Sequence, residues 1–229
     1  MTSALKSKSS YFTLRWAVAV VVSVLLLDQC SKFFIKLNYP LSGYGVPPIL
    51  DWGFFKILFV ENSGMAMGTQ LNDLIPFISD HTAKLILTSF RLVAICGIGY
   101  WLWKTIKKQH SLLLSWALSL IFAGALGNII DSVFYGVIFS DSFRTVATLF
   151  PEQGYAPFFF GHVVDMLQFP LVEWDWPEWI PWIGGDHFLF FQYIFNIADT
   201  SISTGVGILI VFNKKIFGSN EKKNELPSD

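Results

Sequence analysis

Charged residues are scarce in this chain of 229 residues: 14% are Asp, Glu, Lys or Arg, whereas 53% are hydrophobic and 17% are aromatic. A soluble domain averages about 25% charged residues, so this composition argues against a water-soluble fold built on one core. The formal net charge is −1. No basic stripe is interleaved with stacking aromatic residues, which excludes the usual signature of a nucleic-acid partner.

Cysteine and histidine are also few, with two Cys and four His in the chain. Cys30 and Cys96 can form at most one disulfide, and each lies inside an apolar block. Because a buried free Cys behaves as a small hydrophobic residue, we interpret both as packing residues. No CxxC or HExxH spacing occurs, and the histidines are scattered along the chain. We therefore expect neither a metal site nor another cofactor.

The hydrophobic residues gather in four blocks, each near the roughly 20 residues that an α-helix needs to cross a bilayer. We predict transmembrane helices at 14–36, 85–103, 112–136 and 188–213. The first block has a basic start but no small-residue cleavage site after it, so we interpret it as a retained anchor rather than a signal peptide. The sequence thus predicts a mainly α membrane protein with four transmembrane helices.

Lys and Arg concentrate in segments that would lie on one side of a four-span protein. These segments are the tail 1–13 with the start of the first span, the loop 104–111 and the tail 214–229. The positive-inside rule places them on the cytoplasmic side, with both termini. The connections 37–84 and 137–187 then face outward. Both long connections are therefore predicted to be extracytoplasmic.

The two outward connections carry different signals. Aromatic and β-branched residues between Trp52 and Val60 predict one or two strands. The segment 171–182 holds four Trp residues, and Trp favours the lipid–water interface. We expect 137–187 to be an aromatic-rich insertion that covers the membrane surface rather than a folded soluble domain.

Ionisable residues inside apolar blocks are functional candidates, because they are costly beside hydrocarbon. Asp199 follows Asn196 by three residues, a spacing that places both side chains on one face of a helix. Asp28 and Lys32 are spaced i, i+4, which is also typical of a simple interfacial salt bridge. Arg91 lies deep in the second span and suggests an anionic partner within the bundle.

The third span ends in a stripe of small and polar residues, Gly124, Asn128 and Asp131, spaced i, i+4, i+7. Small residues allow helices to approach closely, and polar ones can bond across the contact. For Asn128, helix packing alone explains the pattern as well as a functional site does.

A series of short motifs, taken in order, resembles the lipoprotein signal peptidases (signal peptidase II) over nearly the whole chain. The motifs are Asp28-Gln-Cys-Ser-Lys32, Asn62-Ser-Gly64 with Ala66, Gly127-Asn128-Ile-Ile-Asp131, Gly161-His-Val-Val-Asp165, and Phe195-Asn196-Ile-Ala-Asp199 with Ile202 and Gly205. Each motif is weak alone. Their order on a four-span frame makes the set specific.

The resemblance implies an aspartic intramembrane protease of the bacterial inner membrane. Such enzymes remove signal peptides from prolipoproteins, cutting before a cysteine that carries diacylglycerol. The family's catalytic pair corresponds to Asp165 and Asp199. Residues that line or brace its site correspond to Asp28, Lys32, Asn62, Gly64, Asn128, Asp131 and Asn196. The implied fold is four transmembrane helices with a small extracytoplasmic β-sheet cradle. The implied partners are lipidated prolipoproteins and membrane lipids, and we expect a monomer without a cofactor.

Two departures from the family pattern bear on the site. Ser132 stands where the family usually has Arg, and an insertion separates Gly136 from the motif that ends in Asp165. Asp141 lies nearer to Gly136 but lacks the surrounding pattern, so we prefer Asp165. We further hypothesise that Arg91 supplies the missing charge by pairing with Asp131.

For the catalytic pair, two carboxyl groups in one site share a single proton, because both do not ionise easily together. That arrangement suits hydrolysis of a peptide by activated water. A small transporter subunit, or an assembly protein that uses polar residues as helix contacts, remains an alternative for the same buried groups.

Overall fold

The computed structural model describes residues 12–43, 45–63, 78–109, 111–190 and 193–224. Its long helices are α1 (Leu14–Asn38), α3 (Asp80–Lys107) and α4 (Leu112–Ile130). Helix α4 continues through a π-helical turn, η2 (Asp131–Tyr135), into α5 (Gly136–Ile138), and the chain ends with α6 (Ile197–Val211) and α7 (Asn213–Asn224). Three helical segments, α1, α3 and 112–138, are long and apolar enough to cross a membrane, and α6 is a shorter apolar helix.

Four strands form a small antiparallel sheet in the order β1-β2-β3-β6. They are β1 (Leu50–Asp51), β2 (Lys56–Asn62), β3 (Val163–Gln168) and β6 (Ile194–Phe195). A separate hairpin pairs β4 (Val172–Asp175) with β5 (His187–Phe190). The strand predicted between Trp52 and Val60 is confirmed in β2. Strand β3 lies within the insertion, where the sequence predicted no strand.

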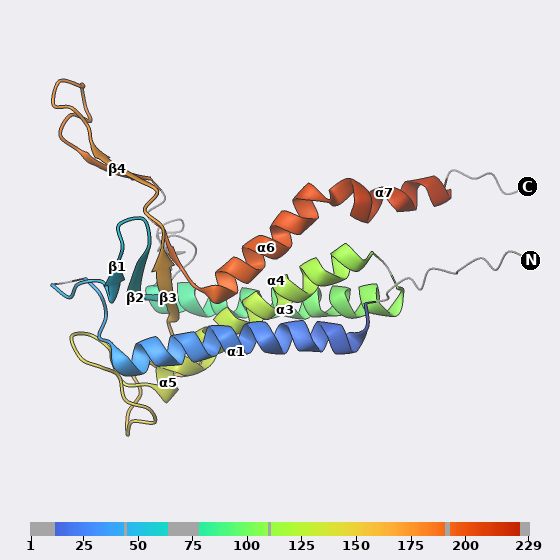
Figure 1. Ribbon diagram of the computed structural model, residues 1–229. Helices are drawn as coiled ribbons and strands as arrows, with labels where there is room; N and C mark the ends of the chain where they lie inside the picture. Colours follow the sequence, from blue (N-terminus) through green and yellow to red (C-terminus); the bar gives the residue numbers. More distant parts are fainter. Residues whose placement is uncertain (1–11, 44, 64–77, 110, 191–192, 225–229) are drawn as a thin grey trace, which may run out of the picture.

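The sheet sits at one end of the helical bundle (Figure 1). The N-terminal end of α1 and the C-terminal end of α7 both lie at the opposite end. There Phe12, Leu102, Leu114 and Ile216 belong to one buried cluster, which joins the segment before α1, the end of α3, the start of α4 and α7. Lys104 and Lys107 in the last turn of α3, and Lys108 directly after it, therefore lie at the end of the bundle remote from the sheet.

The fourth predicted span, 188–213, is corrected by the structure, because its helix begins only at Ile197. Ile194 and Phe195 instead form strand β6, which pairs with Leu167 and Gln168 of β3. The segment before the helix is aromatic and β-branched, and periodicity does not separate a short apolar strand from a buried helix. Helix α3 also begins before the predicted residue 85, at Asp80.

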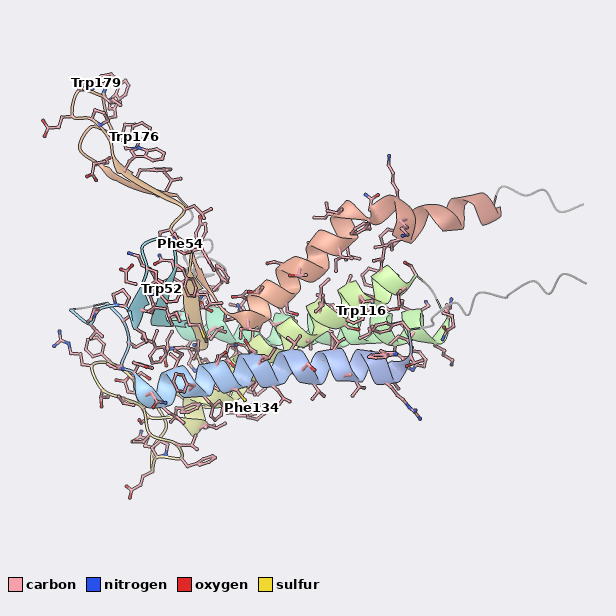
Figure 2. The ribbon with its side chains drawn as sticks, viewed as in Figure 1. Trp52, Phe54, Trp116, Phe134, Trp176 and Trp179 are labelled. Carbon is pink, nitrogen blue, oxygen red and sulfur yellow. The ribbon has the colours of Figure 1, made fainter. Side chains whose placement is uncertain are left out.

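The outer faces of the helices are apolar, as expected for surfaces in contact with lipid. Val93 on α3 and Val211 on α6 are 72% and 73% exposed, and Figure 2 shows such side chains along the bundle. Cys30 and Cys96 are free and exposed, so the interpretation of both as packing residues is wrong. Their small apolar side chains instead belong to this outer surface.

Helices α4 and α6 approach each other closely at Gly124. A methyl group at this position would lie 2.2 Å from the main-chain oxygen of Ala198, a distance that atoms do not adopt. The predicted small-residue stripe on span three therefore packs against the first turn of α6. This contact brings the start of α6, with Asn196 and Asp199, against Asn128 of α4.

Candidate active site

Asn196 and Asp199 form a capping box at the start of α6. The Asn196 side chain accepts a hydrogen bond from the Asp199 main-chain N–H at 2.9 Å, and the Asp199 carboxylate accepts from the Asn196 main-chain N–H at 3.3 Å. Asn196 therefore lies before the helix rather than on its face, which corrects the predicted i, i+3 geometry. The cap satisfies N–H groups that a helix start leaves free.

Asp165 reaches the same place from strand β3. Its carboxylate accepts hydrogen bonds from the side-chain amides of Asn196 at 2.7 Å and Asn62 at 3.3 Å. Asn62 ends strand β2, and it is paired in register with Val163 of β3. Asn196 thus donates to both carboxylates, through its side chain to Asp165 and through its main chain to Asp199.

Lys32 lies at the centre of a fully buried charge network below this pair. Its ammonium is 2.8 Å from a carboxylate oxygen of Asp28 and 2.8 Å from one of Asp131. It also donates to the side-chain oxygen of Asn128 at 3.0 Å. The Asn128 amide then donates to Asp199 at 2.8 Å. Because each charge is paired, the network can remain buried between helices.

Asp28 connects this network to the start of α6. Its second carboxylate oxygen accepts from the main-chain N–H of Ala198 at 2.9 Å, so it satisfies another N–H group at the helix start. Gln29 and Tyr135 were missed by sequence reasoning. Gln29 donates to Asp131 at 2.9 Å and accepts from the Tyr135 hydroxyl at 3.0 Å. The sequence signal that could have identified Gln29 is its position within the motif Asp28-Gln-Cys-Ser-Lys32 of the first span.

Arg91 is close to the site, but its partner differs from the prediction. Its guanidinium donates to the Ser132 hydroxyl at 3.4 Å, and Asp199 and Asp165 are the carboxylates that attract it electrostatically. Among the ion pairs of the described residues, Asp131 pairs with Lys32. The predicted Arg91–Asp131 pair is therefore wrong. Arg91 instead contacts Ser132, the residue that departs from the family pattern.

The environment of Asp165 favours its protonated form. Burial raises the pKa of the Asp165 carboxyl to about 7, and the neighbouring charge of Asp199 adds to the increase. Hydrogen bonds from Asn62 and Asn196 and the charge of Lys32 oppose it. The site therefore combines a carboxyl group that can hold a proton near neutral pH with a second carboxylate close enough to affect it.

The structure brings nearly all of the predicted site residues into this one cluster. Gly64 is outside the described residues. Asp141, the second choice for the catalytic position, is exposed and accepts a hydrogen bond from the nearby Phe143 main-chain N–H at 3.2 Å. Among the residues that the structure describes, no group of three or more His, Cys, Asp and Glu side chains is arranged to hold a metal ion.

Membrane-length apolar helices around buried carboxylates, with a small sheet at one end, define a membrane-embedded protein with a polar site among its helices. A family model described as "Signal peptidase (SPase) II" matches residues 20–214. The chain belongs to this signal peptidase II family.

Proteins named lipoprotein signal peptidase are similar over most of the chain. The protein of Porphyromonas gingivalis is 45% identical over 195 residues, covering 84% of this chain and 80% of that protein. The protein of Amoebophilus asiaticus is 32% identical over 193 residues, covering 84% of this chain and 75% of its own length. Membership in the family makes the chain a peptidase of prolipoprotein signal peptides, which favours that activity over a transporter or an assembly protein.

A solved structure described as a bacterial membrane enzyme shares the fold. It has a TM-score of 0.54 and 22% sequence identity, and the match covers 90% of this chain and 96% of that one. A second such structure has a TM-score of 0.50 and 23% identity, with 96% of each chain covered. The mainly helical fold with a small antiparallel sheet is thus found in known bacterial membrane enzymes.

Proposed function

We propose that the chain is an aspartic endopeptidase that cleaves diacylglyceryl-modified prolipoproteins just before the lipidated cysteine, with Asp165 and Asp199 as its catalytic pair. The observation that carries this proposal is the double donation by Asn196. Its side-chain amide lies 2.7 Å from Asp165, and its main-chain N–H lies 3.3 Å from Asp199. One residue therefore orients both carboxyl groups toward a shared site.

The two carboxyl groups differ in the charge that their surroundings favour. Asp199 accepts N–H donors from Asn128 and Asn196 and lies in the first turn of α6, where the helix dipole favours a negative charge. Asp165 is buried, with a pKa raised to about 7. We therefore assign Asp199 as the general base and Asp165 as the general acid.

In the proposed mechanism, ionised Asp199 removes a proton from a water molecule, and the oxygen of that water attacks the scissile carbonyl carbon. Protonated Asp165 donates a hydrogen bond to the carbonyl oxygen. The proton that Asp199 took from water then passes to the nitrogen of the departing amine, the C–N bond breaks as the C=O bond re-forms, and the other product is a carboxyl group. Because Asp165 must hold a proton, cleavage should decline as pH rises through about 7.

The supporting residues keep this pair in place. Lys32 forms ion pairs with both Asp28 and Asp131 and donates to the oxygen of Asn128, so that the Asn128 amide faces Asp199. Arg91 adds a positive charge opposite the pair. This electrostatic balance offsets the cost of placing several carboxylates among apolar helices.

The membrane arrangement supports a site at the outer face of the inner membrane, with both termini in the cytoplasm. The Lys-rich end of α3, the N-terminal end of α1 and the C-terminal end of α7 lie away from the sheet, and positive segments remain in the cytoplasm. The sheet, with Asp165, then faces the periplasm. A precursor anchored in the bilayer by its acyl chains could reach this site laterally, and the enzyme acts as a monomer.

The test is cleavage of a diacylglyceryl-modified precursor by the purified protein in lipid vesicles, followed by release of the signal peptide. Asp165→Asn and Asp199→Asn should each abolish release while the proteins remain folded and inserted. Asp141→Asn is the matched control, because this exposed carboxylate lies in the same outer connection as Asp165. Full activity of either active-site variant would refute the assignment. Equal cleavage of an unmodified precursor would refute the proposed substrate.

A further inference from the structure

A second buried charge cluster lies on the outward end of α1, one helical turn beyond Lys32. Lys36 is 0% exposed and forms an ion pair with Glu61 of strand β2. Its ammonium donates to the Ser142 hydroxyl at 2.8 Å and lies 4.7 Å from the centre of the Tyr155 ring. An aromatic ring of this kind favours a nearby cation through its negative face.

Glu61 is held from its other side by His162. The ring Nδ1 of His162 lies 3.4 Å from the second carboxylate oxygen of Glu61, and the His162 main-chain N–H donates to the Tyr155 hydroxyl at 2.8 Å. Burial opposes ionisation of Glu61, but the hydrogen bond with His162 and the charge of Lys36 outweigh it and lower the pKa of Glu61. The titratable groups around the pair are Asp131, Asp141 and His162.

The end of β2 and the start of β3, which bear this charge cluster, also carry the candidate active site on the opposite face of the sheet. Glu61 and Asn62 are consecutive in β2, and consecutive side chains of a strand point to opposite faces. Glu61 reaches Lys36, whereas Asn62 reaches Asp165 at 3.3 Å. His162 directly precedes Val163, which is the first residue of β3 and the residue paired with Asn62. The charge cluster therefore holds the end of β2 and the start of β3 in place, and these two segments position the Asn62–Asp165 hydrogen bond.

We propose that Lys36 and Glu61 are positioning residues for catalysis, which act through Asn62 to set the position of the Asp165 carboxyl group. This inference rests on the proposed function and adds a set of residues outside its catalytic pair. The ion pair ties the first membrane helix to the sheet. An apolar pair could fill the same space, but it would lack the directional contacts that fix the end of β2.

Glu61→Gln and Lys36→Met are the test variants, measured in the vesicle assay with the full chain. Each should lower kcat by on the order of 10- to 100-fold, as a small misplacement of a reacting group does, with KM nearly unchanged. The Asn62 hydrogen bond lowers the pKa of Asp165. Its weakening should therefore move the alkaline limb of the pH–rate profile to higher pH.

The matched control is Asp51→Asn, which removes a solvent-accessible ion pair between β1 and Lys56, at the opposite end of β2 from Glu61. It should change neither kcat nor the pH profile. Glu61→Gln should also add little to the defect of Asn62→Ala, because both act through one contact. Independent, multiplicative effects of these two substitutions would overturn the inference.

A double variant, Lys36→Met with Glu61→Leu, separates a loss of positioning from a loss of stability, because an apolar pair can replace a buried ion pair without loss of stability. If it folds, as judged by its thermal unfolding, its kcat should still be low. Wild-type kcat and an unshifted pH profile in this folded variant would overturn the positioning inference alone. Normal cleavage by Asp165→Asn would instead refute the proposed function and this inference together.

Discussion

Replacing Asp165 with Asn should stabilise the folded protein above neutral pH, although it abolishes cleavage. The Asp165 side chain is buried, with 4% exposure, and an amide has nearly the same shape as a carboxyl group. Asn62 and Asn196 donate to different oxygens of Asp165, so the single Asn oxygen can still accept one of the two hydrogen bonds, and the loss of the other costs about 1 kcal/mol. The substitution therefore removes a buried ionisable group without opening a cavity.

The size of the effect follows from the pKa of Asp165, which rises from 3.8 to about 7 on folding. Each tenfold change in proton affinity corresponds to about 1.4 kcal/mol, so folding disfavours the ionised form by at most about 4 kcal/mol. Between these two pKa values the folded state binds more protons than the unfolded state. The free energy of unfolding of the wild type therefore falls as pH rises through this window.

The assay is unfolding of the wild type and of Asp165→Asn in detergent micelles over a range of pH. We expect the variant to be more stable by about 2 to 3 kcal/mol at about pH 8, and this advantage to be lost below about pH 3, where both states of the wild type are protonated. The exposed Asp141→Asn control should show no such difference. A variant no more stable than the wild type at alkaline pH, or a gain that is constant with pH, would refute the reasoning.

Three further outcomes are expected. Lys32→Met leaves the buried carboxylates around it unpaired, Asp131 among them, and should lower the free energy of unfolding by about 3–5 kcal/mol; a variant as stable as the wild type contradicts this. Gly161→Ala should reduce the yield of folded, active protein, because its methyl group would lie 2.1 Å from the Asp131 main-chain oxygen; Gly207→Ala has open space and should behave as wild type. Arg91→Ala should lower kcat and move the alkaline limb of the pH profile upward, because the carboxylate pair loses an attractive charge; unchanged kinetics would exclude this function for Arg91.

Three membrane-length helices, and most of the residues that the structure gathers into the buried polar cluster, could be predicted from the sequence, because long apolar blocks and the order of short polar motifs can be read directly from it. Asp28 and Lys32 illustrate this, since their i, i+4 spacing predicts the contact that the structure contains. The start of the last helix could not be predicted in this way. Residues 194–195 are apolar in either a strand or a helix, and pairing with β3 decides between them.

Long-range contacts account for the other differences. Asn196 and Asp199 were predicted as one group, but their relation is a capping box and not a helix face. The partner of Arg91 depended on which carboxylate Lys32 neutralises, and span order alone does not reveal this. The ion pair between Lys36 and Glu61 has no local sequence signal, because it joins the first helix to strand β2.

The most direct test of the shared-proton site is a difference infrared spectrum between the wild type and Asp165→Asn in vesicles, recorded from about pH 5 to about pH 9. The proposed mechanism predicts a carbonyl band of a protonated carboxyl group in the wild type that fades as pH rises through about 7 and is missing from the variant. A wild type in which Asp165 is already ionised at about pH 5 would contradict it.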